Sequence, residues 1–299
     1  MNEQKYVIKN VDSFEPTHIF ECGQCFRWNK ENAGSYTGVV KSNVLNVKKE
    51  KDNIILTGMC ENHIEELCKE YFDLETDYKE IKHKLSIIDE NLKTSIEYGK
   101  GIRILKQDEW EALISFIISA NNNIPRIKGI IERISQKYGK EIIWKDKKYY
   151  TFPTPEELSE ATIRDLRMLG LGFRDSRVYE TTQMILNKKI DIYSLKNIHD
   201  VNIIREELLK FSGVGPKVAD CIMLFSMKKY EVFPIDVWVK RVMTELYAEE
   251  IEEGVGNDAL VVSKNISNKQ ILELAQNKFG RLAGLAQQYL FYWRRELEK

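Results

Sequence analysis

The sequence lacks the long apolar segments that place a protein in or across a membrane. No apolar run approaches the roughly 18 residues of a membrane-spanning helix, and the first ten residues, MNEQKYVIKN, contain no signal-peptide core. Hydrophobic residues make up 43% and charged residues 30% of the 299 positions, an ordinary balance for a soluble protein. We expect an intracellular protein that makes no membrane contact.

Cysteine and histidine are too few and too scattered to indicate a metal centre. The five cysteines form an odd set, which argues against a secreted disulfide framework, and the four histidines stand alone. Cys22 and Cys25, in the segment CGQC, have the spacing of a redox or zinc half-site, but no second pair completes it. No cysteine follows Cys221, which excludes a cysteine-ligated iron–sulfur cluster near the C-terminus. We expect no required cofactor.

The chain has little net charge. A formal value of −1 does not indicate a nucleic-acid binder. Residues 245–258, however, hold acidic side chains and neither lysine nor arginine, so they mask basic character elsewhere in the chain. We predict a solvated acidic insert at 245–258, and DNA binding stays open on charge alone.

The pattern of apolar residues changes once along the chain. Residues 1–58 alternate short apolar runs with turn residues, as antiparallel strands do, and helical spacing begins near residue 61 and dominates 108–299. This pattern predicts an α+β protein. We expect an N-terminal antiparallel sheet domain with helices over 1–100 and a helical region over 101–299. The helical region is expected to contain a helical subdomain at about 108–208 and a helix-hairpin-helix subdomain at about 209–299.

The segment FSGVGPKVADCI, residues 211–222, places a lysine where a helix should begin. Pro216 suits the first helical position, but Lys217 is unfavourable there because the first turn favours negative charge. Gly213 and Gly215 flank a turn whose backbone N–H groups, with the following helix N-terminus, form an anion site suited to a DNA phosphate. A dinucleotide-binding fingerprint is rejected because a helix, not a strand, precedes the glycines. A simple surface lysine remains an alternative.

Asp236 lies about twenty residues further on, in VFPIDVWVKRV. Its position before an apolar helical pattern predicts an N-cap, which accepts backbone N–H bonds from the first turn. That structural role does not exclude a chemical one.

Seven segments together resemble one family, in that family's order: CGQCFRW, YFDLETDY, GIRILKQDEWEALISFIISANNNIPRI, LRMLGLGFRDSRV, FSGVGPKVADC, PIDVW and GLAQQYLF. They are similar to the helix-hairpin-helix DNA glycosylase superfamily, and within it to the 8-oxoguanine DNA glycosylases. The resemblance implies a bifunctional enzyme that binds damaged double-stranded DNA. It implies that Lys217 attacks C1′, expels the base, forms a Schiff base and nicks the strand by β-elimination, while Asp236 steadies positive charge on the sugar. A helix N-terminus and partial burial both disfavour the ammonium form of a lysine in this position.

The resemblance also implies a pocket for the extruded base. Cys221 packs on one face of the base and Phe291 stacks on the other, while Gln287 reads the Watson–Crick edge. The carbonyl of Gly23 accepts from N7–H, which 8-oxoguanine has and guanine lacks. One buried hydrogen bond is worth about 1–3 kcal/mol, so further discrimination must arise during extrusion. Without the resemblance, the sequence would predict that Cys221 is a small buried hydrophobic residue. It would also predict that Gln287 and Phe291 pack in the core.

Four further residues are implied to contact the opened duplex. Asn121 fills the space that the base vacates, Phe173 wedges into the opposite strand, and Arg126 and Arg174 contact the orphaned cytosine. The alternatives are an asparagine-rich turn that caps a helix and a pair of surface arginines. Phe173 departs from the tyrosine of many members, but a wedge needs only the ring.

Trp238 is the larger departure, because familiar eukaryotic members have histidine two residues after the aspartate. The bacterial variant is therefore the nearer comparison, and we expect a monomer of the prokaryotic cytoplasm or nucleoid. The hairpin is also implied to hold a monovalent cation through the backbone carbonyls of Leu209, Phe211 and Val214.

Two other functions remain as alternatives. One is a sister glycosylase for alkylated bases or mismatched adenine, against which Lys217 and the pair Gln287 and Phe291 argue. The other is a non-catalytic DNA-binding module, whose hairpin would need neither Asp236 nor a lysine in the first turn.

Overall fold

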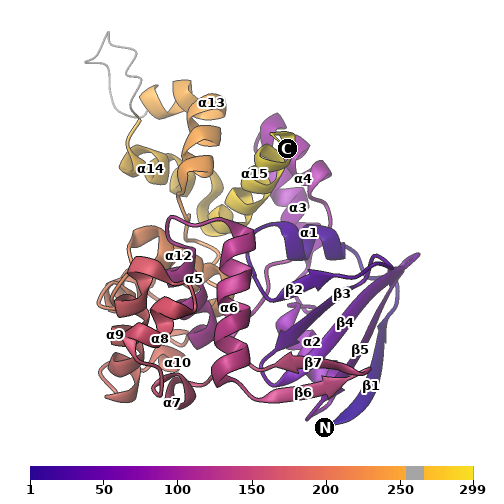
Figure 1. Ribbon diagram of the computed structural model, residues 1–299. Helices are drawn as coiled ribbons and strands as arrows, with labels where there is room; N and C mark the ends of the chain where they lie inside the picture. Colours follow the sequence, from indigo (N-terminus) through magenta and orange to yellow (C-terminus); the bar gives the residue numbers. More distant parts are fainter. Residues whose placement is uncertain (254–265, 299) are drawn as a thin grey trace.

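The computed structural model describes residues 1–253 and 266–298 and has an antiparallel sheet followed by helices (Figure 1). The predicted α+β class is confirmed. In the part of the chain that is described, no helix is both long and apolar enough to cross a membrane.

Five strands form the N-terminal sheet, in the order β1-β5-β4-β3-β2, and every neighbouring pair is antiparallel. Each predicted strand region is confirmed, because alternating side chains such as Leu45, Val47 and Leu56 are buried. They pack with aromatic rings from the flanking helices. The elements are β1 (Asn2–Ile8), α1 (Pro16–Glu21), β2 (Trp28–Lys30), β3 (Tyr36–Val40), β4 (Asn43–Glu50), β5 (Asn53–Cys60) and α2 (Ile64–Tyr71).

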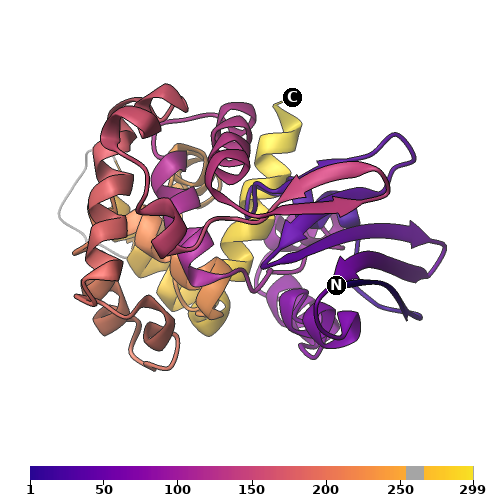
Figure 2. The ribbon, with the colours of Figure 1, turned by 60° about the horizontal axis from the view of Figure 1, so that its bottom comes forward.

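A second sheet interrupts the region predicted to be almost wholly helical. Strands β6 (Glu141–Trp144) and β7 (Lys147–Tyr150) form an antiparallel hairpin that lies next to the N-terminal sheet (Figure 2). Ile142 and Trp144 pack with Val39 and Val44, and the Trp144 indole Nε1 donates to Glu3 Oε1 at 3.1 Å. The helical prediction is therefore wrong at residues 141–150, where the hairpin joins the two halves of the molecule.

Helices build the remainder of the fold, and side-chain caps set many of their starts. Asp77, Asp89, Asp108 and Asn123 each accept a backbone N–H of the first turn. The helices are α3 (Tyr78–Ser86), α4 (Glu90–Tyr98), α5 (Glu109–Ser119), α6 (Ile124–Tyr138), α7 (Pro155–Leu158), α8 (Ile163–Met168), α9 (Asp175–Leu186), α10 (Ile192–Leu195), α11 (Val201–Leu208), α12 (Pro216–Met227), α13 (Val237–Glu253), α14 (Asn268–Phe279) and α15 (Ala283–Leu297), with single-turn helices at Gly172–Arg174 and Gly280–Leu282.

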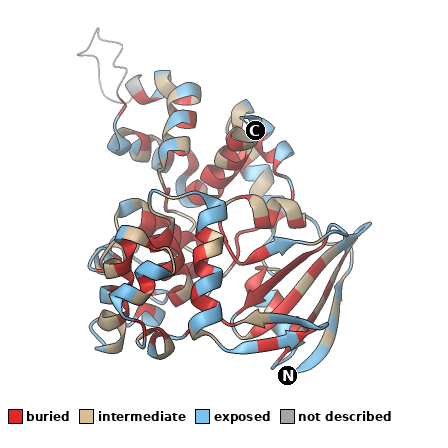
Figure 3. Cartoon of the chain, viewed as in Figure 1, coloured by how far each residue is buried: buried red, intermediate tan, exposed pale blue. Residues whose placement is uncertain are grey.

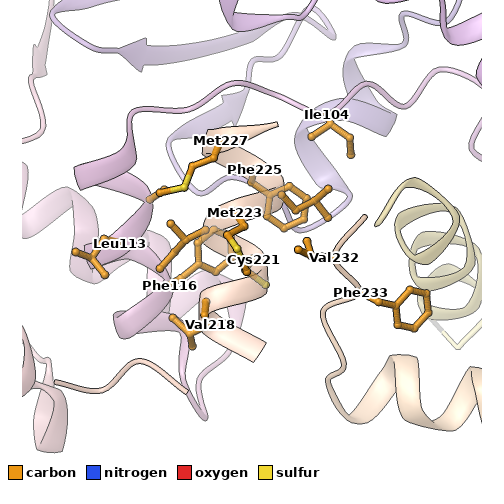
Figure 4. Close-up of a cluster of buried hydrophobic side chains, with 14 of the residues drawn as sticks. Ile104, Leu113, Phe116, Val218, Cys221, Met223, Phe225, Met227, Val232 and Phe233 are labelled. Carbon is orange, nitrogen blue, oxygen red and sulfur yellow. The ribbon is translucent and has the colours of Figure 1, made fainter. Parts of the chain in front are cut away.

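The larger core lies between helices, with α12 buried in the middle of it (Figure 3). Figure 4 shows Phe116 of α5 close to Val218 and Cys221 of α12, and Phe116 also stacks on Phe225 at a centroid distance of 5.6 Å. Apolar residues of α3 and α4 belong to this core, where α4 packs against α15. The domain boundary predicted at residue 100 stays a prediction, as does the division of the helical region near residue 208.

The acidic segment is not an insert over its first nine residues. Helix α13 is kinked at Tyr247, whose φ of −132° and ψ of 19° are not helical, and helical structure then continues through residue 253. Tyr247 and Ile251 are both buried. Glu245 pairs with Arg294 at 3.0 Å and Glu250 with Lys278 at 2.7 Å, so part of the acidic charge is neutralised within the fold. The prediction of an insert is therefore wrong for 245–253, although the side chains of Glu245, Glu249 and Glu250 are exposed as predicted, and residues 254–258 lie outside the described part of the chain.

Candidate active site

The glycine hairpin connects α11 to α12, as predicted, and delivers Lys217 to the first turn of α12. Gly213 has a φ of +84°, and a Cβ there would lie 2.7 Å from Arg177 Cδ, so the turn requires glycine. Gly215 precedes Pro216 and has open space around it. Lys217 is half-buried, with its Nζ 5.5 Å from the centre of the Phe116 ring.

Lys217 and Asp236 both act on the Cys221 thiol. Burial raises the pKa of the Cys221 thiol to about 11, and the charge of Lys217 and a hydrogen bond from its side chain oppose this rise. The negative charges of Asp220 and, to a smaller extent, Asp236 add to this rise in the pKa of Cys221. A cation, a neutral thiol and an anion thus share one site between α12 and the start of α13.

Asp236 is the N-cap of α13, as predicted. Its Oδ1 accepts from the backbone N–H groups of Trp238 at 3.0 Å and Val239 at 2.8 Å. Within the described residues Oδ2 makes no hydrogen bond. One carboxylate oxygen is therefore fixed by the helix, and the other is left to the site that contains Lys217.

The turn that contains Gly23 is held by buried polar contacts. Gln24 Nε2 donates to the carbonyls of Ile19 at 2.9 Å and Arg103 at 2.8 Å, and its Oε1 accepts from Leu105 N at 2.9 Å. Cys22 and Cys25 are buried free thiols whose pKa values burial raises, to about 11 for Cys22. Neither thiol is in a state suited to redox exchange, and CGQC is a structural turn.

One face of α15 closes on the Gly23 turn. Gly23 has a φ of +86°, and a Cβ there would lie 3.2 Å from Phe291 Cε1, so the glycine lets the backbone touch the ring. Gln287, one helical turn before Phe291, is 5% exposed, and its Oε1 has no hydrogen-bond partner among the described residues. A buried amide oxygen without a donor is unfavourable, and it matches a ligand that carries N–H groups.

The loop between α5 and α6 presents Asn121. This residue is exposed and left-handed, with a φ of 51°. Asn122 Nδ2 donates to Ile118 O at 3.1 Å, and Asn123 Oδ1 accepts from Arg126 N at 3.0 Å and caps α6. The alternative of a capping turn is thus confirmed for Asn123, while the Asn121 side chain faces outward.

Arginines surround an exposed aromatic ring beside this loop. Phe173 is 53% exposed, and the guanidinium groups of Arg174 and Arg177 lie 4.2 and 5.1 Å from its ring centre. Arg174 is only 2% exposed and donates to the carbonyls of Ala120 at 2.5 Å and Asn121 at 2.7 Å. It is therefore not a surface arginine. Burial and the charges of Arg126 and Arg177 lower the pKa of Arg174.

Comparisons with known proteins agree along the chain. Residues 6–113 match the N-terminal domain of 8-oxoguanine DNA glycosylase, and residues 114–255 match HhH-GPD superfamily base excision DNA repair proteins. The chain is 32% identical over 307 residues to the N-glycosylase/DNA lyase of Saccharomyces cerevisiae, with 92% of this chain and 81% of that protein covered. It is 32% identical over 240 residues to a probable N-glycosylase/DNA lyase of Methanothermobacter thermautotrophicus, with 74% and 71% covered. The chain belongs to the 8-oxoguanine DNA glycosylase family of the HhH-GPD superfamily.

A solved structure of this glycosylase family has the same fold. The 8-oxoguanine glycosylase/lyase of Clostridium acetobutylicum, in complex with double-stranded DNA containing cytosine opposite 8-oxoG, gives a TM-score of 0.91 at 44% identity. The match covers 100% of this chain and 98% of that one. The resemblance drawn from the seven motifs is confirmed, and so is the class of enzyme, a DNA glycosylase with lyase activity.

Trp238 has structural contacts in this member of the glycosylase family. Its indole lies under the Arg241 guanidinium at 5.0 Å, and Arg241 pairs with Glu298 at 3.0 Å. The tryptophan thus helps to join α13 to the end of α15, and no histidine chemistry is available at this position.

Several residues of the glycosylase site escaped prediction from the sequence. Gln24 and Gln288 fix the Gly23 turn, the latter by donating to Cys22 O at 2.6 Å, and Phe116 supports Lys217. Arg295 donates to Glu21 O. Helical spacing could have indicated Arg295, since Gln287, Phe291 and Arg295 are successively four apart. The partners of Gln24 and Gln288 are backbone carbonyls, which leave no mark in a sequence.

Proposed function

We propose that this chain excises 8-oxoguanine paired with cytosine in duplex DNA and nicks the abasic strand. The observation that carries the proposal is the placement of Lys217 on the first turn of α12, one helical turn before Cys221, a thiol on which Asp236 also acts. Membership of the family supports the class of reaction, and the positions of Lys217, Cys221 and Asp236 support the proposed mechanism. No metal or cofactor takes part in any step.

After its ammonium group has lost a proton, the Lys217 amine attacks C1′ of the damaged nucleoside. A bond forms between Nζ and C1′, and the bond from C1′ to N9 breaks, so the base leaves with the electron pair and takes up a proton. The amine then loses a proton and the sugar ring opens, which gives an imine between Nζ and C1′. Loss of a C2′ proton and cleavage of the C3′–O bond nick the strand, and water hydrolyses the imine.

Asp236 stabilises positive charge on the sugar during this attack. Its Oδ1 is held by the N-terminus of α13, so the carboxylate cannot turn away. A fixed anion beside a developing cation lowers the barrier without reorganisation.

The base binds between Cys221 and Phe291. Gln287 Oε1, which lacks a donor, accepts from the N–H groups of the Watson–Crick edge. The Gly23 carbonyl accepts from N7–H, and guanine is disfavoured there because its N7 carries a lone pair. Phe291 touches Gly23 in this structure, so its ring moves aside to admit the base.

The exposed loops hold the opened duplex. Asn121 fills the space left by the base and Phe173 wedges into the opposite strand, because both side chains are outward-facing. Arg126 contacts the orphaned cytosine. Arg174 is buried and donates to Asn121 O, so it contacts the cytosine only after it leaves this carbonyl.

The hairpin grips the phosphate backbone of the damaged strand. The N–H groups around Gly213 and Gly215 bind a phosphate, a contact that positions the protein and reads no sequence. The carbonyls of Leu209, Phe211 and Val214 would hold a monovalent cation. Phe211 O also accepts from Val214 N at 3.1 Å, so one of its lone pairs remains for the ion.

The enzyme acts as a monomer in a prokaryotic cytoplasm. Relatives from an archaeon and yeast leave the source open, and the prokaryotic assignment rests on Trp238.

Trapping with borohydride tests the mechanism. Incubation with duplex DNA containing 8-oxoguanine opposite cytosine, followed by borohydride, should reduce the imine and give a covalent adduct. Lys217→Gln should give none, because an amide cannot form the imine. Duplexes with 3-methyladenine or adenine opposite guanine serve as controls, and an adduct with these but not with 8-oxoguanine would favour a sister glycosylase. An undiminished adduct with Lys217→Gln would overturn the role of this residue.

A further inference from the structure

The pocket-facing side of α15 continues one turn beyond Phe291. Gln287, Phe291 and Arg295 lie at intervals of four residues, which places them on one face of the helix. Arg295 is 9% exposed, and its guanidinium carbon lies 5.1 Å from the centre of the Phe291 ring. A buried cation therefore supports the ring that stacks on the base.

Arg295 also contacts the turn on the other side of the pocket. Its Nη2 donates to Glu21 O and pairs with Glu296 Oε1 at 3.0 Å. A Cβ on Gly23 would lie 3.1 Å from Arg295 Nη1, so this nitrogen borders Gly23 directly. Arg295 thus links the Gly23 turn to Phe291, the two parts of the structure between which we place the extruded base.

Two nitrogens of this guanidinium have no acceptor. Within the described residues Nε and Nη1 are buried and make no hydrogen bond. Buried charged donors are normally paired, since each unpaired group loses its hydration without replacement. Gln287, on the same face of α15, has a buried acceptor, Oε1, that receives no hydrogen bond among the described residues. A purine with carbonyl oxygens and ring N–H groups satisfies both, whereas an abasic sugar supplies neither.

We propose that Arg295 is a further specificity-determining residue of this pocket, where it fixes the Gly23 turn and donates from Nη1 to a carbonyl oxygen of the extruded purine. The inference rests on the proposed function, since it needs the base to enter between Gly23 and Phe291. Arg295 should therefore matter for excision of the base, but not for nicking of an abasic site from which the base is already missing.

The test compares two reactions in each variant. Single-turnover excision of 8-oxoguanine opposite cytosine requires the base, whereas nicking of a preformed abasic site opposite cytosine does not. Arg295→Met keeps the length of the side chain and removes its donors. We expect excision to fall by about tenfold or more, while abasic nicking stays within about twofold. Arg295→Lys retains one donor group and should give an intermediate loss of excision.

Arg294→Met is the matched control. Arg294 is the next residue on α15, but it pairs with Glu245 and Glu298 away from the Gly23 turn. Both reactions should stay near the wild-type rates in this variant. If Arg295→Met does not fold, Arg295→Lys carries the test through the same ratio of the two rates.

Three results would overturn the inference. Equal losses of excision and abasic nicking in Arg295→Met would show that the residue only supports the fold. Unchanged excision in an active enzyme would remove Arg295 from the pocket and leave the proposed function intact. A wild-type protein that nicks abasic sites but excises no 8-oxoguanine would overturn the proposed function, and this inference with it.

Discussion

Single residues in this site combine a structural contact with a chemical one. Asp236 is the clearest case, because Oδ1 caps α13, while Oδ2 makes no hydrogen bond among the described residues and is free for the proposed chemical role. A substitution that keeps the cap and removes the charge can separate the two roles.

Asp236→Asn is that substitution. Asparagine caps helices about as well as aspartate, so the free energy of unfolding should change by less than about 0.5 kcal/mol. The rate of base excision should fall by roughly a hundredfold or more, because the anion that stabilises the sugar cation is lost. Urea denaturation and single-turnover excision measure the two effects. An intact excision rate would exclude an electrostatic role for Asp236.

Glu111 on α5 predicts a pH dependence of stability. Its side chain is 15% exposed, and burial raises its pKa from 4.5 to about 7 although Arg27 lies 3.8 Å away. Because the folded state holds this proton longer, the contribution to stability is complete below pH 4.5 and is lost as the pH rises through about 7. Wild type should therefore lose roughly 1–3 kcal/mol relative to Glu111→Gln between about pH 5 and 8. Urea unfolding at several pH values measures this difference, and a constant difference would contradict the shift.

At the scale of elements, the hairpin between α11 and α12 offers a matched pair of glycines. Gly213 has a positive φ and touches Arg177, whereas Gly215 has a φ of −106° and nothing within 4 Å of an added Cβ. Gly213→Ala should lower the free energy of unfolding by about 1 kcal/mol or more, and Gly215→Ala should leave it nearly unchanged.

Gly213→Ala and Gly215→Ala both lie in the turn at which we propose that a DNA phosphate binds. Each should therefore weaken binding to duplex DNA regardless of sequence, by steric crowding of the backbone. Thermal unfolding and fluorescence anisotropy separate the effects on fold and binding. Full DNA affinity in Gly215→Ala would mean that the phosphate lies elsewhere.

Helical periodicity and turn residues predicted most elements, and the failures have local causes. The strands of the β6–β7 hairpin are four residues long, and its turn is made by Lys145 and Asp146 in left-handed conformations rather than by asparagine and glycine. In α13 the many acidic residues suggested a solvated segment, although Tyr247 and Ile251 within it are buried. The run is tolerated because Lys278 and Arg294, distant in sequence, neutralise part of it.

Site residues that are brought together by helical spacing could be predicted from the sequence. Site residues whose side chains bond to distant backbone groups were harder to predict. Lys217 and Cys221 lie four apart on one helix, and the structure places them together. The burial of Arg174 could not be inferred, since its acceptors are carbonyls of a turn formed 50 residues earlier in the chain.

At the scale of the whole molecule, the net charge of −1 conceals a local basic surface. Arg126, Arg174 and Arg177 lie near Phe173, and no carboxylate among the described residues pairs with any of the three. We therefore expect binding to DNA to depend on Arg126, Arg177 and the hairpin rather than on the overall charge, whereas Arg174 is buried.

We expect DNA affinity to weaken steeply between about 50 and 200 mM salt, as counterions are released from each contacted phosphate. Arg177→Ala should reduce the slope of log K against log salt by about 1 if Arg177 binds one phosphate. Arg294→Ala is the control, because Arg294 is already paired with carboxylates. Equal slopes in wild type and Arg177→Ala would remove Arg177 from the interface.

The regular spacing of pocket residues on α15 has a consequence for how the enzyme can change. Gly284 sets the rotation of this helix, because its N–H donates to Tyr230 O at 2.7 Å and a Cβ there would lie 2.7 Å from Leu224 Cδ1. Inserting one residue between Gly284 and Gln287 would swing Gln287, Phe291 and Arg295 together by about 100°. If these three side chains form the proposed base site, its specificity can change by substitution of single residues, whereas a change of length in that turn would displace all three.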